Sequence, residues 1–288
     1  MRSFHYARPE TLAEALELLN EHGASASVLA GGTDLIARLR AGRELPSIVI
    51  DLKRVRALQA GIRECGAFLR IGANTTMAQL IADEQVRSCF PALAEAAHNV
   101  GSMQIRNRAS LAGNICNASP AADTAPALLV YEAVVNLAGK DGTRRVALKD
   151  FFTGPGHTVV RRGELVESLD LPWPTRPQAA CFERLTRRRG VDLATVNLCC
   201  LVRASGQTVF AYGAVAPTPL LLREDSGKLA DPNCDHHERD AILASLVACA
   251  SPRSDVRATK GYRSAMLLIM SRRALQTALG RLHEKKRQ

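Results

Sequence analysis

The spacing of apolar residues near the start of the chain predicts an amphipathic helix. Apolar positions recur every three to four residues over 12–19, the interval of one helix face. Thr11 and Glu14 stand at the two positions of a capping box, where a hydroxyl and a carboxylate accept hydrogen bonds from free backbone N–H groups. We expect the helix to end at Gly23, because glycine commonly terminates helices.

A strand, a glycine turn and a second helix follow. The run 26–30 predicts a short buried strand, and Gly31-Gly-Thr-Asp34 comes directly after it. Apolar positions from Leu35 onward then predict a helix that closes near Gly42. Such a turn gathers backbone N–H groups and a helix N-terminus at one spot, which attracts phosphate. The turn is neither a G-x-G-x-x-G fingerprint nor a Walker A loop, and alone a double glycine after a strand is more often a tight turn than a ligand site.

The rest of the first half alternates short strands with short helices. Apolar or alternating runs predict strands over 47–51, 68–73 and 165–171, and helices over 75–81, 91–97 and 125–132. Two further strands, 133–138 and 144–148, flank Lys140-Asp-Gly-Thr143, a strong hairpin signal. The segment 151–156, which contains Gly154-Pro-Gly156, predicts a rigid connector.

A cluster of prolines predicts a domain boundary. Pro172-Trp-Pro174 ends the strand before it, and Pro177 follows closely. Beyond it, two strands at 193–204 and 207–216 are joined by a tight turn, and helical patterns follow over 238–249 and 259–282. The chain is therefore predicted to be α+β, with a second domain in which a hairpin-rich layer is covered by C-terminal helices.

One stretch in the middle of the chain, residues 101–123, fits none of these patterns. It has no apolar run long enough for a helix or a central strand, and it is rich in glycine, serine, asparagine and alanine. Short polar side chains compete with regular structure by bonding nearby backbone groups. Long loops inside compact domains are uncommon unless they are functional. We therefore expect this stretch to approach a bulky anionic ligand, with a plain surface loop as the alternative.

Composition excludes several classes of protein. The chain has 288 residues, 47% of them hydrophobic, and no segment approaches the 18 or so uninterrupted apolar residues of a membrane span. Its start has no secretion signal, which predicts a cytoplasmic location. None of the eight cysteines belongs to a C-x-x-C pair, so no zinc or [2Fe–2S] ligand set is visible, and we expect reduced thiols.

A net charge of +10 permits an anionic ligand, an acidic partner or nucleic acid. Much of the excess is local, in Arg184 with Arg187–Arg189 and in the tail 285–287. Solvated or disordered segments account for both runs more simply than a binding site does. Nucleic-acid binding lacks a recognised motif here, and aromatic residues, which form stacking platforms, are only 4% of the chain.

Taken together, the two glycine-rich stretches are far more specific than either alone. Ala30-Gly-Gly-Thr-Asp34, followed about 80 residues later by Gly101-Ser-Met-Gln-Ile-Arg-Asn-Arg-Ala-Ser-Leu-Ala-Gly-Asn-Ile-Cys-Asn-Ala-Ser-Pro-Ala-Ala-Asp123, resembles the FAD-binding subunits of the molybdenum hydroxylases. Phe151-x-x-Gly-Pro-Gly156, Val215-Ala-Pro-Thr-Pro219 and Ser251-Pro-Arg-Ser-Asp-Val-Arg-Ala258 agree with that resemblance. It covers nearly the whole chain and looks closest to the FAD-binding subunit of bacterial xanthine dehydrogenase.

The resemblance implies a particular fold. Residues 1–174 would form an FAD-binding domain of the vanillyl-alcohol-oxidase (PCMH) type, built from subdomains of about 1–55 and 56–174. Residues 175–288 would form an α/β domain like the C-terminal domain of the CO dehydrogenase flavoprotein. FAD would lie between the two N-terminal subdomains. The inserted iron–sulfur segment of the benzoyl-CoA-reductase branch has no counterpart here.

The resemblance also implies which residues bind FAD. Glycines would let the backbone reach the diphosphate, hydroxyls would donate without bulk, and Asp123 would accept hydrogen bonds from adenosine or ribityl hydroxyls. The implied cofactor-binding residues are Leu29, Ala30, Gly31, Gly32, Thr33, Asp34, Val100, Ala109, Ser110, Gly113, Asn114, Cys116, Asn117, Ala122, Asp123, Val166 and Arg184.

Ala112 and two of these positions, Ser110 and Arg184, depart from the family pattern. The usual Gly-Gly-Asn reads Ala112-Gly113-Asn114, so Ala112 must have a negative φ or be strained. Ser110 replaces a threonine. Arg184 falls near the place of a flavin-side lysine, and arginine is not equivalent to lysine.

The implied function is electron transfer by an oxidoreductase subunit. A molybdenum cofactor on a large subunit would oxidise the substrate, and [2Fe–2S] clusters on a small subunit would carry the electrons. FAD on this chain would then pass the electrons to an acceptor, expected to be NAD⁺. A xanthine dehydrogenase-like complex would belong to purine metabolism, but substrate choice would lie on the large subunit.

Within this chain we expect no catalytic acid or base and no metal ligand. FAD would be bound non-covalently, since Cys116, the nearest candidate for attachment, fits better as a small packing residue. The alternative is a self-contained FAD oxidase. It would need its own apolar substrate cavity with a base over the flavin, and the chain is short for that.

Overall fold

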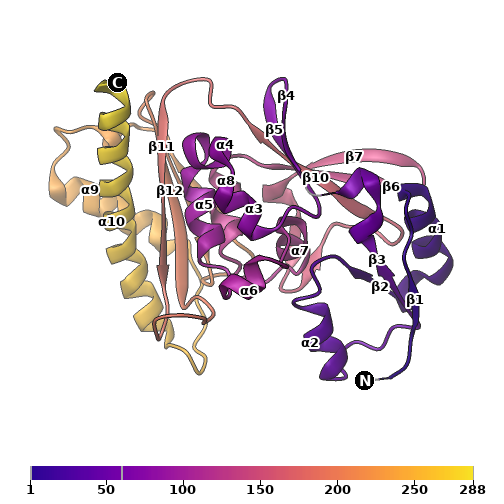
Figure 1. The fold of residues 1–288 in the computed structure, drawn as a ribbon. Helices are drawn as coiled ribbons and strands as arrows, with labels where there is room; N and C mark the ends of the chain where they lie inside the picture. Colours follow the sequence, from indigo (N-terminus) through magenta and orange to yellow (C-terminus); the bar gives the residue numbers. More distant parts are fainter. Residues whose placement is uncertain (1, 60, 288) are drawn as a thin grey trace.

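The protein, described by a computed structural model over residues 2–59 and 61–287, consists of three main β-sheets with helices packed on them (Figure 1). The side chains of Lys286 and Arg287, part of the predicted basic tail, lie outside the described part. Within the described chain, none of the helices combines the length with the apolar character that a bilayer-spanning segment needs.

The first sheet is parallel, with strand order β1-β3-β2. Its elements are β1 (His5–Ala7), α1 (Leu12–His22), β2 (Ala26–Leu29), α2 (Leu35–Arg40) and β3 (Ile48–Asp51). The predicted capping box is confirmed, since the Glu14 N–H donates to Thr11 Oγ1 at 3.2 Å and the Thr11 N–H to Glu14 Oε2 at 3.5 Å. The predicted strands and helices of this region are also confirmed. Strand β1, which sequence did not predict, is only three residues long.

The second sheet is antiparallel, with strand order β4-β5-β10-β6-β7. Its strands are β4 (Ile62–Cys65), β5 (Phe68–Gly72), β6 (Val134–Gly139), β7 (Gly142–Ala147) and β10 (Leu165–Pro172). The hairpin predicted around Lys140-Asp-Gly-Thr143 is confirmed as β6–β7. The predicted rigid connector at 151–156 is instead partly a strand, because β8 (Phe152–Gly154) pairs with β9 (His157–Thr158).

Six short helices lie between β5 and β6. They are α3 (Met77–Ala82), α4 (Glu84–Cys89), α5 (Pro91–His98), α6 (Met103–Arg106), α7 (Leu111–Cys116) and α8 (Thr124–Val130). The prediction that residues 101–123 contain no helix was wrong. Serine side chains cap both short helices of this stretch: Ser102 Oγ accepts from the Ile105 N–H at 3.3 Å, and Ser110 Oγ from the Gly113 N–H at 3.1 Å. Short polar residues of the kind that argued against a helix therefore form the N-caps of α6 and α7.

The third sheet is antiparallel, with strand order β11-β12-β13-β14. Its elements are β11 (Gln178–Leu185), β12 (Val196–Arg203), β13 (Thr208–Gly213), β14 (Leu220–Glu224), α9 (His236–Ala248) and α10 (Lys260–Arg287). Strands β12 and β13 and both helices confirm the predicted hairpin-rich layer with C-terminal helices. Strands β11 and β14 were not predicted. Short 3₁₀ turns connect several of the elements, at 23–25, 52–54, 56–58, 148–150 and 228–230.

Both faces of this third sheet are buried, which explains the unbroken apolar run of β12. Alternate residues face opposite ways: Cys199 and Leu201 join the core of the N-terminal half, whereas Leu198 and Cys200 pack toward α10. Figure 1 shows α10 along one face of β11 and β12, with α5 and α8 on the other side. The sheet is thus sandwiched between the helices of the two halves.

Glu95 on α5 ties the N-terminal half to the edge strand of this sheet. Its Oε2 accepts a hydrogen bond from the backbone N–H of Phe182 at 3.1 Å. Its Oε1 pairs with Arg281 Nη2 of α10 at 2.6 Å, and Arg281 Nη1 donates to the carbonyl of Ala180 at 2.6 Å. One carboxylate therefore connects α5, β11 and α10.

Candidate cofactor-binding cavity

A cavity of about 800 Å³ lies where the first two sheets meet the loop between β11 and β12. Most of its wall comes from four parts of the chain: residues 28–38, 100–123, 158–166 and 184–193. Glu44, Leu52, Ala73 and Asn74 complete it. This volume falls in the upper part of the range for small-molecule and cofactor sites, about 300–1,000 Å³. The cavity is therefore large enough for an extended ligand.

The structure brings almost all of the predicted cofactor-binding residues to this one cavity. Its wall contains Ala30, Gly31, Gly32, Thr33, Asp34, Val100, Ala109, Ser110, Gly113, Asn114, Cys116, Asn117, Ala122, Asp123, Val166 and Arg184. Leu29 is the exception, because its side chain packs against a small apolar cluster with Leu35, Leu39 and Val49. Two stretches that the sequence paired only by resemblance thus form parts of one wall.

The first loop offers free backbone donors to the cavity. Within the described chain, the N–H groups of Gly31, Gly32, Thr33 and Asp34 donate to no other protein atom. Four consecutive free donors in a cavity wall suit an anionic group such as phosphate. Gly32 has φ +79°, a left-handed conformation that favours glycine, so this turn requires glycine at position 32.

The second loop is held by backbone bonds to the start of α3 and by side-chain bonds within it. The Leu111 N–H donates to the Thr75 carbonyl at 3.0 Å, and the Met77 N–H to the Ala109 carbonyl at 2.9 Å. Asn114 Oδ1 accepts from Thr124 Oγ1 at 2.7 Å. These bonds hold the backbone of the loop beside α3 and fix the side chain of Asn114.

Side chains join the two loops at the cavity wall. Arg38 of α2 donates to Asn117 Oδ1, and Asn117 Nδ2 donates to Asp34 Oδ1 at 3.4 Å. Asn117 thus uses both ends of its amide to bridge from the second loop to the first. Both Asp34 and Asn117 are predicted site residues, and here they touch each other.

Ala112 is unstrained. It lies inside α7, buried to 4% exposure, and its φ is negative, so alanine fits without the cost anticipated for it. The non-glycine residue with a left-handed conformation in residues 101–123 is Ala118, with φ +46°, whose carbonyl accepts from the Gly156 N–H at 2.9 Å. That conformation is unusual for alanine, and the sequence carried no sign of it.

Asp123 is buried in the wall at 7% exposure and faces two groups from the third sheet. Its Oδ1 accepts from Asn197 Nδ2 at 2.8 Å and lies 3.2 Å from Arg184 Nε. Burial raises the pKa of Asp123 to about 6, although the Arg184 charge and the Asn197 hydrogen bond both oppose that rise. The carboxylate is therefore costly to keep ionised until further donors reach it.

Arg184 is anchored from several sides. Its Nη1 donates to the carbonyl of Asn99 at 3.0 Å, its Nη2 donates to the carbonyl of Asp192, and its side chain is only 10% exposed. The expectation that the whole basic run is solvated was therefore wrong for Arg184. Its guanidinium closes the cavity beside Asp123.

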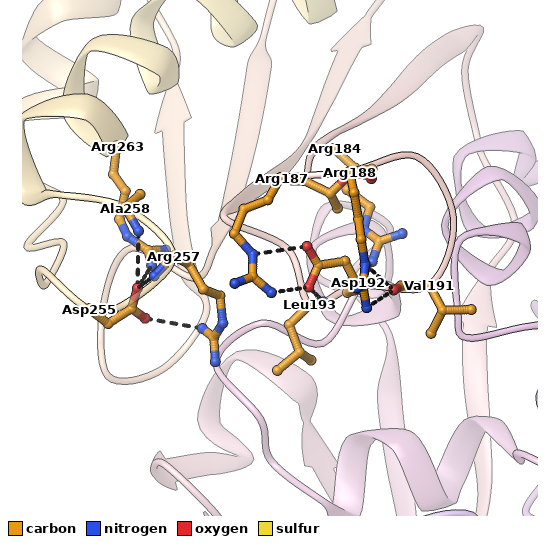
Figure 2. A network of polar contacts seen from close by, with 11 residues as sticks. Arg184, Arg187, Arg188, Val191, Asp192, Leu193, Asp255, Arg257, Ala258 and Arg263 are labelled. Atoms are coloured by element: carbon orange, nitrogen blue, oxygen red, sulfur yellow. Dashed lines mark hydrogen bonds and ion pairs between the residues drawn. The ribbon is translucent and has the colours of Figure 1, made fainter.

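Sequence reasoning missed Asn197 and the loop after β11. Asn197 sits fully buried in the apolar run of β12, and a lone polar residue in such a strand was the available signal. Arg188, Val191, Asp192 and Leu193 line the cavity from this loop. Thr158 of β9, Val160 and Glu164 of the connection that follows, and Leu165 at the start of β10 line it as well. Figure 2 shows how the loop is held: Arg187 bonds Asp192, and Arg188 bonds the Val191 carbonyl at 3.1 and 2.9 Å.

The cavity fits a large flavin nucleotide. The free N–H groups of the first loop can donate to a diphosphate, the small residues of the wall leave room for one, and Asp123 can accept from hydroxyl groups. Within the described residues, no group of three or more histidine, cysteine or acidic side chains is arranged to hold a metal ion.

Comparisons with known proteins cover nearly the entire chain. Residues 2–174 match the model of the FAD binding domain in molybdopterin dehydrogenase, and residues 180–278 match that of the CO dehydrogenase flavoprotein C-terminal domain. The carbon monoxide dehydrogenase medium chain of Hydrogenophaga pseudoflava is 32% identical over 96% of this chain and 98% of that protein. The xanthine dehydrogenase FAD-binding subunit of Escherichia coli O157:H7 is 29% identical over 95% of both.

The fold agrees with these sequence matches. A solved structure of carbon monoxide dehydrogenase from Hydrogenophaga pseudoflava contains a chain that superposes with a TM-score of 0.89 at 31% identity. The superposition covers 97% of this chain and 98% of that one. Identity is slightly higher to the carbon monoxide dehydrogenase chains than to the xanthine dehydrogenase subunit.

Proposed function

The chain belongs to the family of FAD-binding medium subunits of the molybdenum hydroxylases, and from this premise we propose that it passes electrons from a partner subunit through FAD to NAD⁺. It is an oxidoreductase subunit with the α+β fold of that family. FAD supplies the chemistry that links one-electron donors to a two-electron acceptor. The protein contributes position, charge and the exclusion of water.

The observation that carries this proposal is the meeting of the two loops in one large cavity. The free N–H groups of residues 31–34 would hold the diphosphate, and the bridge from Asn117 to Asp34 would fix the spacing between the loops. Asp123 would accept from hydroxyl groups of FAD, which would also stabilise its ionised form. Arg184 would place a positive charge beside that carboxylate. The remaining cavity residues predicted from sequence are proposed to line the bound FAD.

We propose that the functional unit is a hetero-oligomer. A large subunit would carry the molybdenum cofactor and choose the substrate, and a small subunit would carry [2Fe–2S] clusters. A xanthine dehydrogenase-like reaction in purine metabolism and a cytoplasmic location are part of the same proposal. So is the division of the chain into domains 1–174 and 175–288, with subdomains of about 1–55 and 56–174.

Expression of the chain alone tests the proposal. The purified protein should be yellow, or become yellow with added FAD, and should reduce a dye with NADH. A protein that gains no FAD on reconstitution would contradict it. A yellow protein that oxidises a small organic substrate unaided would favour the self-contained oxidase instead. Co-purification with molybdenum- and iron–sulfur-bearing chains tests the hetero-oligomer.

A further inference from the structure

A second pocket, of about 350 Å³, lies between the β11–β12 loop and the segment that leads into α10. Arg187, Thr186 and Thr195 line one side of it, and Arg257, Thr259 and Tyr262 line the other. We refer to these six residues as the arginine pocket. None of them was among the predicted FAD-binding residues.

Each arginine of this pocket is held by a carboxylate of its own (Figure 2). Arg187 Nε and Nη2 donate to the two oxygens of Asp192 at 3.1 and 2.8 Å. Arg257 Nη1 donates to Asp255 Oδ2 at 3.1 Å, and Asp255 is fixed in turn by Arg263 Nη2 at 2.8 Å. These bonds limit the freedom of both guanidinium groups, so a ligand would meet donors that are already oriented.

Both arginines keep hydrogen-bonding capacity. Within the described chain, Arg187 Nη1 and the Nε and Nη2 atoms of Arg257 donate to no protein acceptor. The two segments 186–196 and 253–263 together contain seven arginine or lysine residues and only two acidic residues. Free guanidinium donors, an excess of positive charge and threonine hydroxyls suit a phosphate group. Tyr262, half exposed, adds a flat apolar surface beside them.

The arginine pocket adjoins the FAD cavity through a shared wall. In the loop after β11, Arg188, Val191, Asp192 and Leu193 face the FAD cavity, while Thr186, Arg187 and Thr195 face the arginine pocket. Asp192, which lines the first, is bonded to Arg187, which lines the second. The same loop therefore forms the boundary between the two pockets.

We propose that the arginine pocket binds a phosphate group of a dinucleotide electron acceptor whose other end reaches the flavin. This inference rests on the proposed function, because it takes the acceptor to be a soluble nicotinamide dinucleotide. It adds the place where the phosphate is recognised and the residues that recognise it, with Arg257 and Arg187 as the main donors.

Binding to the FAD-loaded full-length chain tests this directly. Calorimetric titration with ADP, which has phosphates but no nicotinamide, should show binding, and adenosine, which has no phosphate, should bind at least about tenfold more weakly. Arg257→Gln should weaken ADP binding about tenfold and raise the KM for NADH by a similar factor. Arg257→Lys keeps the positive charge but loses the planar guanidinium, so its ADP affinity should lie between those of wild type and Arg257→Gln. Flavin content should equal that of wild type in both variants.

Arg253→Gln is the matched control. Arg253 is exposed, lies in the same segment and does not line the pocket, so its replacement should leave ADP affinity unchanged. Equal ADP affinity in wild type, Arg257→Gln and Arg253→Gln would overturn the proposal. So would inorganic phosphate that binds as tightly as ADP yet does not raise the KM for NADH, because the pocket would then hold only a free anion.

The same titrations separate this inference from the proposed function. If Arg257→Gln no longer binds ADP while no form of the chain oxidises NADH, the phosphate site is supported and the proposal that NAD⁺ is the acceptor is refuted. If NADH is oxidised by all forms with the same KM, NAD⁺ stands as the acceptor and the arginine pocket is refuted.

Discussion

Gly31 lies so close to the carbonyl oxygen of Arg108 that a Cβ atom on residue 31 would stand 2.0 Å from it. The carbonyl carbon of Arg108 would be 2.7 Å away and the Cα of Ala109 3.1 Å. All three are backbone atoms, so no side-chain movement relieves the contact. The first and second loops therefore approach to a distance that only glycine permits.

Gly31→Ala should separate the two loops. We expect a loss of at least about 2 kcal/mol in unfolding free energy, as for other overpacked sites, and loss of FAD retention. Urea unfolding and the flavin absorbance of the purified protein measure the two effects. Gly280→Ala is the control: it is exposed within α10 with open space around it, and should stabilise by about 0.5–1 kcal/mol. A Gly31→Ala variant as stable and as yellow as wild type would mean that the loops do not meet as described.

Asp123 should make the stability of the FAD-free protein depend on pH. Burial raises its pKa to about 6, whereas an aspartate in an unfolded chain titrates near 3.9. The folded state thus favours the protonated form, whose stabilising contribution is present at low pH and lost as pH rises through about 6. Between pH 4 and pH 7.5, wild type should lose about 2–3 kcal/mol relative to Asp123→Asn.

Urea unfolding of both FAD-free proteins at the two pH values measures this difference. The Asp123→Asn chain is the reference because its amide does not titrate, so pH effects from other groups cancel in the comparison. A difference in unfolding free energy that stays constant across the range would refute the assigned environment of Asp123.

Two substitutions of Glu95 distinguish the stability contributed by its hydrogen bond from the stability contributed by its ion pair. Glu95→Ala removes the acceptor of the buried Phe182 N–H as well as the partner of Arg281, and should cost about 2 kcal/mol. Glu95→Gln keeps an oxygen for the N–H and loses only the partly exposed ion pair, so it should cost less than about 1 kcal/mol. Urea unfolding of the two variants is the measurement. Equal losses would show that the ion pair, not the backbone bond, ties α5 to β11.

Local signals in the sequence predicted the elements whose stability is itself local. The capping box of α1, the β6–β7 hairpin and the turn at Gly31-Gly-Thr-Asp34 all depend on residues within a few positions of one another. Strand β1 has no such signal, because three residues become a strand only by pairing with β3. β14 is likewise defined by its pairing with β13, and β11 by β12 on one side and Glu95 on the other.

The residues of the candidate site also divide into those with a local sequence signal and those that depend on distant contacts. Sixteen of the seventeen residues named in advance line the cavity, because they belong to recognisable motifs. Asn197 could not, since its role depends on a contact with Asp123 across 74 residues of chain. The opposite error occurred at residues 101–123, where a high content of polar residues argued against helix although Ser102 and Ser110 begin one each.

The position of Asp123 between the halves has a consequence for the order of biosynthesis. Its partners Arg184 and Asn197, and the loop between them, are made after both glycine-rich loops have left the ribosome. Ala214 adds a later contact, its N–H donating to the Pro120 carbonyl at 2.6 Å. A nascent chain that has reached residue 174 holds both loops but lacks this wall. Completion of the cavity is therefore a late event in translation, and we expect FAD capture to follow synthesis of the second half of the chain.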